Sequence, residues 1–498
     1  MIRFPSERVA RALEQAGLLV ERRGGLPAEL AGITDDSRSV ERGGLFVAVR
    51  GSARDGHDYL EAAADRGAVA AIVEDASRTP LPALVVRDAR RSAAIAAAAA
   101  YDFPAAGLQL VAATGTNGKT TTVGILRHLL DSIQSPAASV GTLGVLRGSA
   151  GREVPGGSGL TTPGPVELQR VFRALADDGV RAVAMEVSSH SLDQRRVEGV
   201  AFDAAVFTNL TRDHLDYHGS MEAYFAAKAR LVEQLKAEGA AVVNADDPAW
   251  RELPRAPRVI TFSAAGVRSG DVGAADVWAT DVRFTPRGTE LVLHIGPVHE
   301  QVTLPLIGDF NVANALGAAA AAWAIGVAPS EVAQRLRGAP QVPGRLEMIH
   351  EGPTVLRDYA HTPDALERAL AAVRPFVTGR LIVVFGAGGD RDRGKRPEMG
   401  RIAAAGADLA IVTSDNPRTE DPERILDDIE AGMGSARRER IEDRRAAIAR
   451  ALAVAEEGDV IVLAGKGHET YQVRGTEKLP FDEREIVREL AGEAAGRA

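Results

Sequence analysis

The stretch LQLVAATGTNGKTTTVGILRHLL, residues 108–130, decides the fold of this chain. It starts with an apolar run typical of a buried strand, passes through a glycine-rich loop, and ends in a pattern typical of an amphipathic helix. The order strand, glycine-rich loop, helix indicates a nucleotide-binding α/β domain. We therefore predict a central P-loop domain built on a mainly parallel sheet.

The loop at residues 114–120 carries the groups that bind a phosphate. Its glycines let backbone N–H groups approach phosphate oxygens at a helix N-terminus, Lys119 adds a positive charge, and the Thr120 hydroxyl is a ligand for Mg²⁺. Ala113 stands where the general P-loop pattern has its first glycine. The alternative is an ordinary glycine turn beside a solvated lysine. We favour the phosphate site because a strand pattern and a helix pattern flank the loop.

Apolar runs on both sides of the loop extend the α/β pattern. The first hundred residues mix short strand patterns with alanine-rich helical stretches, which predicts a small N-terminal α/β domain. After the loop, buried-strand patterns are spaced by helical segments, as a parallel sheet requires. The alternating pattern of residues 277–304 predicts antiparallel strands, and the pattern of residues 311–327 predicts a helix. The other strand patterns cover residues 44–49, 68–73, 83–86, 182–185, 204–207 and 240–243.

Three apolar runs in the last third of the chain each end in glycine or aspartate. They are LIVVFGAGGD (381–390), ADLAIVTSDN (407–416) and GDVIVLAGKG (458–467). The carboxyl ends of parallel strands meet at one edge of an open α/β sheet, where ligands usually bind. We therefore predict a Rossmann-like C-terminal α/β domain with a binding site at that edge.

The length of the chain and two clusters of proline and glycine together predict three domains. A chain of 498 residues exceeds the size at which one hydrophobic core keeps growing. Its 45% hydrophobic and 26% charged residues are typical of a folded protein. Clusters of proline and glycine interrupt the patterns at residues 103–107 and 339–344. We place the three domains at residues 1–104, 105–341 and 342–498.

Composition excludes several classes of function. The chain has no cysteine, so disulfides, thiolate catalysis and cysteine metal sites are excluded, and a hard cation such as Mg²⁺ fits the remaining ligands best. A net charge of -9 argues against nucleic-acid binding. No apolar stretch reaches the roughly 20 residues that span a bilayer, and the first residues do not read as a signal peptide. We expect a cytoplasmic protein without membrane insertion, and a monomer.

Polar residues that follow the central strand patterns are candidate catalytic groups. Glu186 comes directly after an apolar run, where its carboxylate can complete a Mg²⁺ shell. His214 follows another such run, although a histidine there is often only structural. Lys228 lies on a helical pattern and would normally face solvent. Only six of the 59 Lys and Arg residues are lysine, however, and a primary amine can be carbamylated into a metal-binding carboxylate.

Three loops after the C-terminal strand patterns offer charges of both signs. Arg391 lies in the first loop, Asp415-Asn416-Pro417-Arg418 form the second, and residues 465–469 (GKGHE) form the third. Arginine binds carboxylates and acidic side chains bind ammonium groups, which suits a free amino acid. The alternatives are that Asp415 caps a helix and that Asn416-Pro417 form an ordinary turn.

The sequence resembles the Mur ligase family over nearly its whole length. The motifs that carry the resemblance follow one another in order along the chain. They are TDDSRSVERGGLFVAVRG, ATGTNGKTTT, TTPGP, MEVSSHSLDQRRV, FTNLTRDHLDYHGSMEAYFAAKARL, GDFNVANALGA, PGRLE, DYAHTPDAL, GAGGDRDRGKRPEMG, SDNPRTEDP and GKGHE.

The resemblance implies an ATP- and Mg²⁺-dependent ligase that joins a free amino acid to UDP-MurNAc-L-Ala-D-Glu through an acyl phosphate. It also assigns site residues to each domain. The UDP-MurNAc dipeptide would contact Ser37, Ser52, Ala53, Arg54, Thr161, Thr162, Ser188, Gln194 and Arg196. ATP would contact Gly115, Thr116, Asn117, Gly118, Lys119, Thr120, Thr121, Asn311, Arg345 and Asp358. Metal ions would contact Thr120, Glu186, His214 and carbamylated Lys228; the amino acid would contact Arg391, Asp415, Asn416, Pro417, Arg418, Gly465 and Glu469.

Arg418 decides which amino acid the resemblance implies. The side chain of lysine ends in a bare ammonium, whereas meso-diaminopimelate ends in a second amino-acid centre whose carboxylate suits a bidentate arginine. We therefore expect diaminopimelate. The alternatives are the lysine-adding ligase of the same family, another ligase of the superfamily such as a folate polyglutamate synthase, and a P-loop ATPase switch or inactive nucleotide-binding scaffold.

Overall fold

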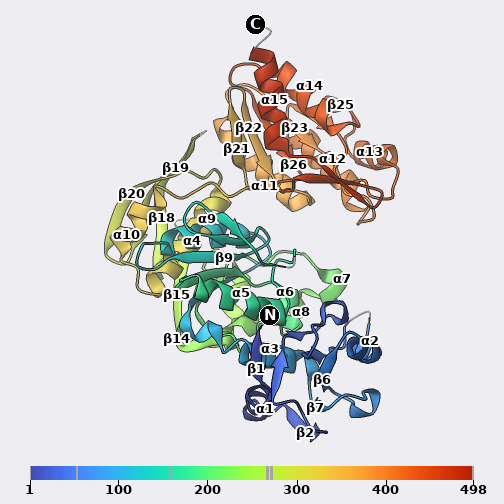
Figure 1. Ribbon diagram of the computed structural model, residues 1–498. Helices are drawn as coiled ribbons and strands as arrows, with labels where there is room; N and C mark the ends of the chain where they lie inside the picture. Colours follow the sequence, from blue (N-terminus) through green and yellow to red (C-terminus); the bar gives the residue numbers. More distant parts are fainter. Residues whose placement is uncertain are drawn as a thin grey trace. The chain divides into compact units, whose positions relative to one another are not determined.

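The computed structural model describes residues 2–51, 54–157, 159–264, 268–269, 273–285 and 287–495 (Figure 1). The chain divides into two compact units. Unit 1 comprises Met1–Ala279, Leu293–Glu300 and Ala313–Arg335, and unit 2 comprises Thr280–Val292, Gln301–Val312 and Leu336–Ala498. The predicted boundaries near residues 104 and 341 stay predictions.

The first part of unit 1 is a small sheet with helices on both faces. Its strand order is β2-β7-β6-β5-β4, parallel from β7 to β4 with β2 antiparallel at the edge. One face packs against α1 and α3 and the other against α2. The elements are α1 Ser6–Gln15, β2 Leu19–Arg23, β4 Ile33–Thr34, β5 Gly44–Val47, α2 Leu60–Asp65, β6 Ala68–Val73, β7 Ala83–Val86 and α3 Ala89–Ala100, with β1 Arg3–Pro5 paired to β3 Glu29–Ala31 beside them.

The central sheet is built around β8, Gln109–Thr114, which belongs to unit 1. Its order is β11-β10-β9-β12-β8-β13-β14-β15-β18-β19-β20. β8 pairs in parallel with β12 (Ala182–Glu186) and β13 (Phe202–Phe207), and α4 (Lys119–Leu130) follows β8 through the glycine-rich loop. The carboxyl ends of these three strands therefore meet at one edge, which we call the central edge. The remaining strands are β9 Ala137–Gly141, β10 Gly144–Arg147, β11 Arg152–Val154, β14 Leu235–Asn244, β15 Arg258–Ser263, β18 Val277–Thr285, β19 Gly288–Ile295 and β20 Val298–Leu304.

The far end of this sheet agrees with the predicted antiparallel strands. β19 and β20 are neighbours joined only by Gly296 and Pro297, and a connection this short joins antiparallel strands. The predicted helix at 311–327 is α9, Asp309–Ala324. The other elements outside the C-terminal sheet are α5 Pro165–Asp177, α6 Ser189–Asp193, α7 Leu215–His218, α8 Met221–Ala229, α10 Pro329–Leu336 and the short pair β16 Arg268–Ser269 with β17 Gly273–Ala274.

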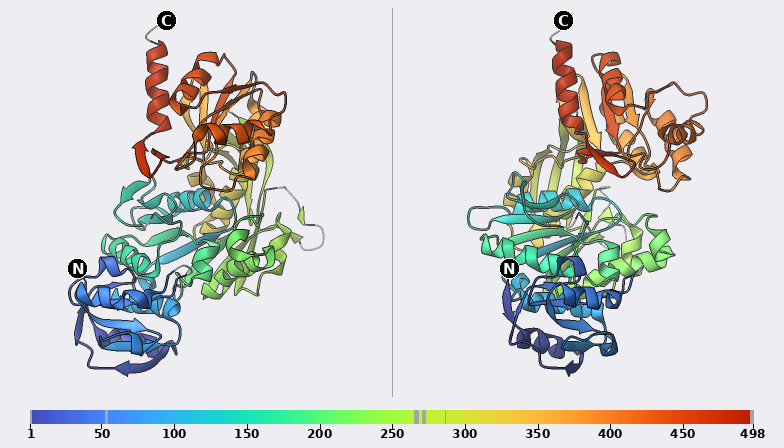
Figure 2. Two further views of the ribbon diagram at one scale, coloured as in Figure 1. Left: turned by 90° about the vertical axis from the view of Figure 1, so that its right-hand side faces the viewer. Right: turned by 45° about the vertical axis from the view of Figure 1, so that its right-hand side comes forward.

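Unit 2 contains a second α/β sheet with the order β21-β22-β26-β23-β24-β25. All its pairs are parallel except β21 with β22. Helices α11, α12 and α13 pack on one face, and α14 and α15 on the other (Figure 2). The elements are β21 Glu347–Glu351, β22 Thr354–Asp358, α11 Pro363–Val373, β23 Leu381–Phe385, α12 Lys395–Gly406, β24 Leu409–Val412, α13 Pro422–Glu430, β25 Arg438–Arg440, α14 Arg444–Val454, β26 Val460–Ala464, β27 Tyr471–Arg474, β28 Glu477–Pro480 and α15 Glu483–Ala495.

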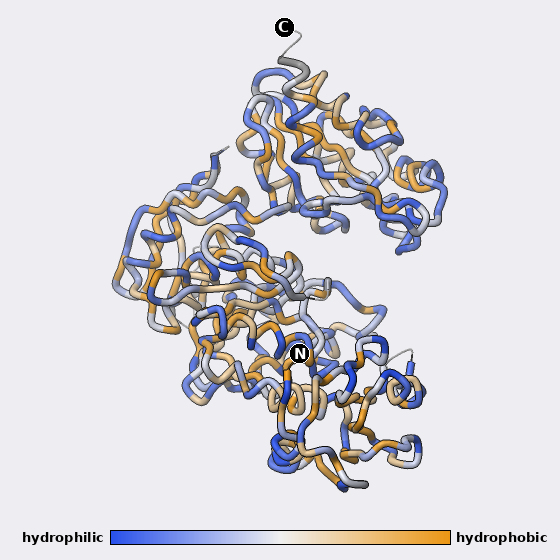
Figure 3. Tube along the Cα trace, in the orientation of Figure 1, coloured by the Kyte–Doolittle hydropathy of each residue, from blue (hydrophilic) through white to orange (hydrophobic). Residues whose placement is uncertain are grey.

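Figure 3 shows apolar stretches recurring along the trace in both units. Every residue of β23 and of β26 is buried, because helices cover both faces of a parallel sheet. The predicted strands of the C-terminal third are β23, β24 and β26, and they end at the same edge of the sheet, which we call the C-terminal edge. In the described part of the chain, no helix is long and apolar enough to cross a membrane.

Candidate active site

The glycine-rich loop adopts a conformation that requires its glycines. Gly115 has a φ of 145°, and a Cβ there would overlap the hydroxyl of Thr208. Gly118 has a φ of 88° and forms the N-cap of α4. The Lys119 ammonium donates to the carbonyl oxygens of Gly115 and Thr116, each at 2.9 Å. The Lys119 ammonium therefore lies over the loop at the N-terminus of the helix, where anions bind.

Residues just past β13 hold the loop in place. The backbone N–H of Asn117 donates to Oδ1 of Asn209 at 2.9 Å, and the Thr208 hydroxyl donates to the carbonyl oxygen of Asn117 at 2.6 Å. The N–H of Thr116 donates to the carbonyl oxygen of Asn209 at 2.7 Å. The sequence analysis did not single out Thr208 and Asn209, although the motif FTNLTRD contains both.

Glu186 lies at the central edge among oxygen atoms suited to Mg²⁺. It is 2% exposed and accepts hydrogen bonds from the hydroxyl of Thr120 at 3.1 Å and from the N–H of Thr142 at 2.8 Å. The Glu186 carboxylate and the Thr120 hydroxyl supply hard oxygen ligands, which fit Mg²⁺. Across the described residues, no group of three or more His, Asp and Glu side chains forms a metal site. A cation here would therefore take further ligands from phosphate or water.

Lys228 is buried, so the alternative of a solvent-facing lysine is wrong. Its side chain is 1% exposed, its Nζ donates to the carbonyl oxygen of Gly115 at 2.8 Å, and the Nζ lies 4.5 Å from the ring centre of Tyr224. Burial lowers the pKa of Lys228 well below its ordinary value, the charge of Lys119 lowers it further, and Asp213 partly opposes both. Burial and the charge of Lys119 therefore favour the neutral form of this amine, which lies beside the glycine-rich loop.

His214 belongs to a cluster of histidines and tyrosines that the sequence analysis did not predict. Its ring centre lies 4.8 Å from that of His190 and 6.2 Å from that of Tyr224. The ring centre of His190 also lies 4.2 Å from that of Tyr217 and 5.4 Å from that of His218. Burial lowers the pKa of His190 to about 4, and burial also lowers the pKa of His214. The motifs SSHSL and RDHLDYH contain His190, His214, Tyr217 and His218, and this concentration of His and Tyr is the available sequence signal.

The structure joins the residues predicted to hold the muramoyl peptide to Glu186. The Thr162 hydroxyl donates to the backbone carbonyl of Glu186 at 2.9 Å and accepts from the N–H of Ser188 at 3.1 Å. The Arg196 guanidinium donates to the backbone carbonyl of Thr162 at 2.9 Å and to Oε1 of Gln194 at 3.1 Å. The Thr142 hydroxyl donates to that of Thr161 at 3.2 Å. This network lies at the central edge, and Thr142 is a member that sequence reasoning missed.

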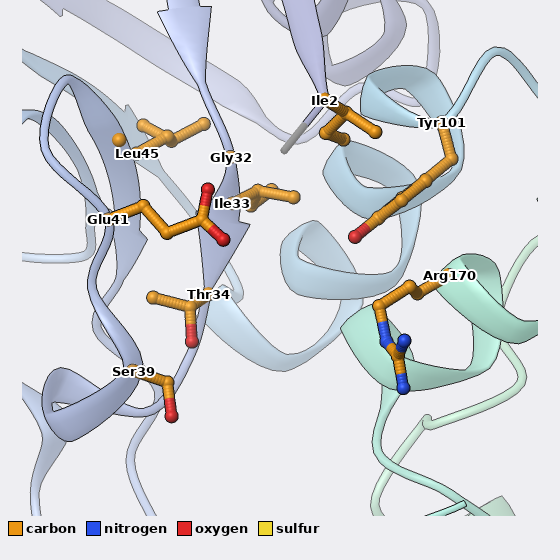
Figure 4. A pocket seen from close by; sticks show the side chains of 10 residues that line it. Ile2, Gly32, Ile33, Thr34, Ser39, Glu41, Leu45, Tyr101 and Arg170 are labelled. Atoms are coloured by element: carbon orange, nitrogen blue, oxygen red, sulfur yellow. The ribbon is translucent and has the colours of Figure 1, made fainter. Parts of the chain in front are cut away.

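Of the predicted nucleotide contacts in the N-terminal part, the two described residues, Ser37 and Arg54, do not contact each other directly. Ser37 starts a one-turn helix capped by Asp36, whereas the Arg54 guanidinium donates to the Tyr59 hydroxyl at 3.4 Å. Ser52 and Ala53 lie outside the described residues. A cavity of about 340 Å³ nearby is lined by other residues, namely Ile2, Gly32, Ile33, Thr34, Ser39, Glu41, Gly44, Leu45, Tyr101 and Arg170 (Figure 4).

Unit 2 holds the remaining predicted nucleotide contacts. Asp358 is buried at the end of β22 and accepts a hydrogen bond from the N–H of Leu346 at 2.7 Å, and burial raises its pKa to about 6. The Arg345 guanidinium lies 5.1 Å from the ring centre of Tyr359. Asn311 is buried and donates to the carbonyl oxygen of Ile307 at 2.8 Å.

The three C-terminal loops converge as predicted. The N–H of Gly389 donates to the carbonyl oxygen of Asn416 at 2.9 Å, and the Asn416 amide donates to Oε2 of Glu469 at 2.9 Å. The Arg418 guanidinium donates to the carbonyl oxygen of Gly389 at 2.7 Å. A Cβ on Gly465 would overlap the carboxylate of Asp415. Hydrogen bonds therefore join the loops into one wall at the C-terminal edge.

Two details of this wall bear on the alternatives. Asp415 does not cap α13, because the cap is Asp421, whose carboxylate accepts from the N–H of Glu423 at 3.1 Å. Pro417 does begin a turn, since its carbonyl oxygen accepts from the N–H of Glu420 at 3.2 Å. Arg391 lies on the exposed side and donates to the carbonyl oxygen of Asp390 at 3.1 Å.

The fold and the central edge define a nucleotide-binding α/β protein of the P-loop class. The chain belongs to the Mur ligase family, as the sequence predicted. Three family models match it: "Mur ligase family, catalytic domain" over residues 29–104, "Mur ligase middle domain" over residues 113–322, and "Mur ligase, glutamate ligase domain" over residues 344–467.

Curated relatives and solved structures resemble the chain over nearly its full length. A UDP-N-acetylmuramoyl-L-alanyl-D-glutamate–2,6-diaminopimelate ligase from Geobacter metallireducens is 47% identical over 95% of this chain and 97% of its own. The enzyme of the same name from Gloeobacter violaceus is 44% identical over 99% of this chain and 100% of its own. A solved structure with that name matches with a TM-score of 0.69 at 35% identity, covering 96% of this chain and 98% of its own.

Proposed function

We propose that this chain is an ATP-dependent ligase that adds meso-diaminopimelate to the D-glutamate γ-carboxylate of UDP-MurNAc-L-Ala-D-Glu in peptidoglycan biosynthesis. The observation that carries the proposal is the position of Arg418. It lies in a wall that also contains Asn416 and Glu469, within a chain 47% identical to a relative named for this reaction. A guanidinium beside acidic and amide groups suits the second amino-acid centre of diaminopimelate.

The reaction has two steps. An oxygen of the γ-carboxylate attacks the γ-phosphorus of ATP, which gives an acyl phosphate and ADP. The neutral amine of the L-centre then attacks the acyl carbon, an amide forms, and inorganic phosphate leaves. Lys119 and the N–H groups at the start of α4 stabilise the charge that develops on the phosphoryl oxygens. No side chain forms a covalent bond to substrate.

The oxygen cluster at the central edge fits a magnesium ion. Thr120 and Glu186 would hold it, and when bound it would neutralise phosphate charge. Gly115 to Thr121 would bind the phosphates through the loop backbone, and Asn311, Arg345 and Asp358 are proposed as further nucleotide contacts.

Lys228 is proposed to carry a carbamate that, with His214, holds a second cation. Carbamylation joins the amine nitrogen to the carbon of CO₂ with loss of a proton, which requires a neutral amine. The burial of Lys228 and its place beside Gly115 support this assignment. A carbamate would turn a buried amine into an oxygen ligand next to the phosphate loop.

The remaining contacts divide between the two substrates. Thr161, Thr162, Ser188, Gln194 and Arg196 are proposed to bind the muramoyl peptide, because their network reaches the backbone of Glu186. Ser37 and Arg54 are proposed to bind the uridine end, with Ser52 and Ala53 in the same loop as Arg54. We also propose a cytoplasmic location, because ATP and UDP-linked precursors are intracellular substrates.

One assay tests the proposal. The purified protein receives ATP, Mg²⁺ and UDP-MurNAc-L-Ala-D-Glu with meso-diaminopimelate, with L-lysine, or with neither, and released phosphate and product mass are measured. We expect phosphate and an amide product only with diaminopimelate. Equal use of lysine would show that the chain is a lysine-adding ligase instead. Phosphate release without any acceptor would support the ATPase switch.

A further inference from the structure

A buried lysine at the C-terminal edge has no role in the function proposed above. Lys466 follows Gly465 at the end of β26, and its side chain is 0% exposed. Its neighbours are the residues proposed to bind the amino acid. Lysine rarely lies fully buried unless its charge is paired, so the contacts of this side chain should explain its presence.

The Lys466 ammonium joins two of the pocket loops. Its Nζ donates to Oδ1 of Asn416 at 2.9 Å and to Oε2 of Glu469 at 3.3 Å, and lies 3.6 Å from Oδ1 of Asp415. An ammonium has three donors and no acceptor. Two acceptors and the nearby carboxylate of Asp415 therefore surround it, and each belongs to a residue of the wall.

These contacts fix the orientation of the Asn416 amide. Its Oδ1 accepts from Lys466 and also from the N–H of Val473 at 2.9 Å. The oxygen end is therefore fully used, and Nδ2 is the end that donates to Glu469 at 2.9 Å. An amide Nδ2 has a second N–H, which is the donor that a substrate carboxylate needs.

Lys466 also sets the net charge of the acidic side chains around it. Asp415 and Glu469 contribute two negative charges and Lys466 one positive charge, so the three side chains together carry one negative charge. In the proposed reaction the L-centre amine of diaminopimelate attacks in its neutral form, whereas the D-centre keeps its ammonium. Arg418 in the same wall adds a positive charge for the D-centre carboxylate. The net negative charge of the three side chains then matches that single ammonium.

Arg444 supports the backbone of the same loops independently of Lys466. The Arg444 guanidinium donates to the carbonyl oxygen of Ala464 at 3.0 Å and pairs with Glu483 at 2.7 Å, and both charged side chains are 0% exposed. Arg444 thus holds the end of β26 without help from Lys466. Loss of the Lys466 ammonium should disturb the side chains of the wall more than its backbone.

We propose that Lys466 is a positioning residue for the amino-acid substrate. It holds Asn416 and Glu469 in the orientation that binds the D-centre of diaminopimelate and leaves one negative charge for the D-centre ammonium. The proposal rests on the function proposed above and assigns a role to a residue outside the sites described there.

A pair of methionine variants provides the first test. Lys466→Met keeps an unbranched side chain without the charge, and Lys478→Met, an exposed lysine on the nearby strand β28, is the matched control. We expect Lys466→Met to raise the KM for diaminopimelate about 10- to 100-fold, the range for lost hydrogen bonds to charged groups. The KM values for ATP and for the UDP-MurNAc dipeptide should stay near those of the wild type, as should all three in Lys478→Met.

The absence of cysteine allows a sharper test that separates charge from size. Lys466→Cys introduces a single thiol, which is alkylated in denaturant with 2-bromoethylamine or with 1-bromopropane; each forms an S–C bond and releases bromide. The products have the length of lysine with a terminal amine or a terminal methyl. Wild-type protein taken through the same unfolding and refolding is the control, and mass spectrometry verifies each product.

We expect the aminoethyl protein to recover the wild-type KM for diaminopimelate and the propyl protein to resemble Lys466→Met. Equal KM values in the two alkylated proteins would overturn the proposal, because size alone would then explain the effect. A wild-type KM in Lys466→Met would also overturn it. If the wild type itself forms no amide with diaminopimelate, the proposed function fails instead, so the two failures are distinguishable.

Discussion

The central edge and the C-terminal edge each bury a lysine, and the two lysines have opposite surroundings. Lys228 contacts a backbone carbonyl and an aromatic ring, and no carboxylate lies within ion-pair distance of it among the described residues. Lys466 contacts an amide and two carboxylates. Burial without a carboxylate favours a neutral amine that can be modified, whereas burial with carboxylates produces a fixed cation that positions its neighbours.

The same contrast extends to the whole of each edge. The central edge gathers backbone N–H groups, Lys119 and one buried carboxylate, Glu186, which suits a polyphosphate with a cation. The C-terminal edge mixes Arg418 with Asp415 and Glu469, which suits a molecule that carries both charges. In the function proposed above, the central edge serves phosphoryl transfer and the C-terminal edge selects the amino acid. The predictions below change one edge at a time.

The largest effect is expected from Lys119→Met. Loss of the charge that stabilises the transferring phosphoryl group should lower kcat for amide formation by about 10³-fold, without a change in selectivity between diaminopimelate and lysine. The measurement is product formation by mass spectrometry. Lys236→Met, which removes a partly exposed lysine paired with Asp203, is the control and should keep its rate. A wild-type kcat in Lys119→Met would contradict the role given to the loop.

Arg418→Lys should change selectivity and leave the central edge intact. A lysine cannot bind a carboxylate in bidentate fashion, so kcat/KM for diaminopimelate relative to L-lysine should fall by about 100-fold. Competition between the two amino acids in one reaction measures this ratio. Arg393→Lys, at an exposed arginine paired with Glu420 at 3.1 Å, is the control. Unchanged selectivity would show that the second carboxylate is not recognised by Arg418.

Lys228→Ala tests whether the central lysine acts as a carbamate. Wild-type activity should fall in CO₂-free buffer and return when bicarbonate is added, by about 10-fold in each direction, because a metal ligand is lost and regained. The variant should have low activity that bicarbonate does not change and that acetate partly restores, since acetate supplies a carboxylate to the vacated space. A bicarbonate response that persists in the variant would exclude Lys228 as its source.

The smallest effect concerns the pH dependence of stability at the C-terminal edge. Burial lowers the pKa of His468 to about 4, and the charge of Arg345 adds to this. An unfolded histidine has a pKa of about 6.5, so the unfolded state binds more protons between these values and stability falls as the pH drops from about 6.5 to 4. His468→Gln should lose less stability than the wild type between pH 7 and pH 5.

Urea unfolding at pH 5, 6 and 7 measures this difference, which we expect to be on the order of 1 kcal/mol. His299→Gln, which changes an exposed histidine, is the control and should follow the wild type. Parallel pH profiles for His468→Gln and the wild type would show that His468 does not contribute to the acid sensitivity.

The sequence predicted the strands and the order of the loops well. Strand formation depends on the local pattern of apolar residues, and loops depend on the local positions of glycines. β6 and β7 have the predicted bounds, whereas β13 and β14 begin earlier than their apolar cores, since Asp203 and Lys236 pair with each other at the start of both strands. The convergence of the C-terminal loops was also predictable, because parallel strands end at one edge.

Other parts of the site could not be predicted because they depend on neighbours distant in sequence. The helical pattern around Lys228 does not show that Gly115 covers its amine. Thr142 becomes part of the site only because β9 lies beside β12. Lys466 was quoted within a motif, but its role depends on Asn416, fifty residues earlier.

The central claim is that the chain activates the γ-carboxylate as an acyl phosphate before the amine attacks. The most direct measurement uses UDP-MurNAc-L-Ala-D-Glu labelled with ¹⁸O in that carboxylate, with ATP, Mg²⁺ and meso-diaminopimelate. Mass analysis of the released phosphate should find one ¹⁸O atom for each amide formed. Phosphate without the label, released together with amide, would contradict the account.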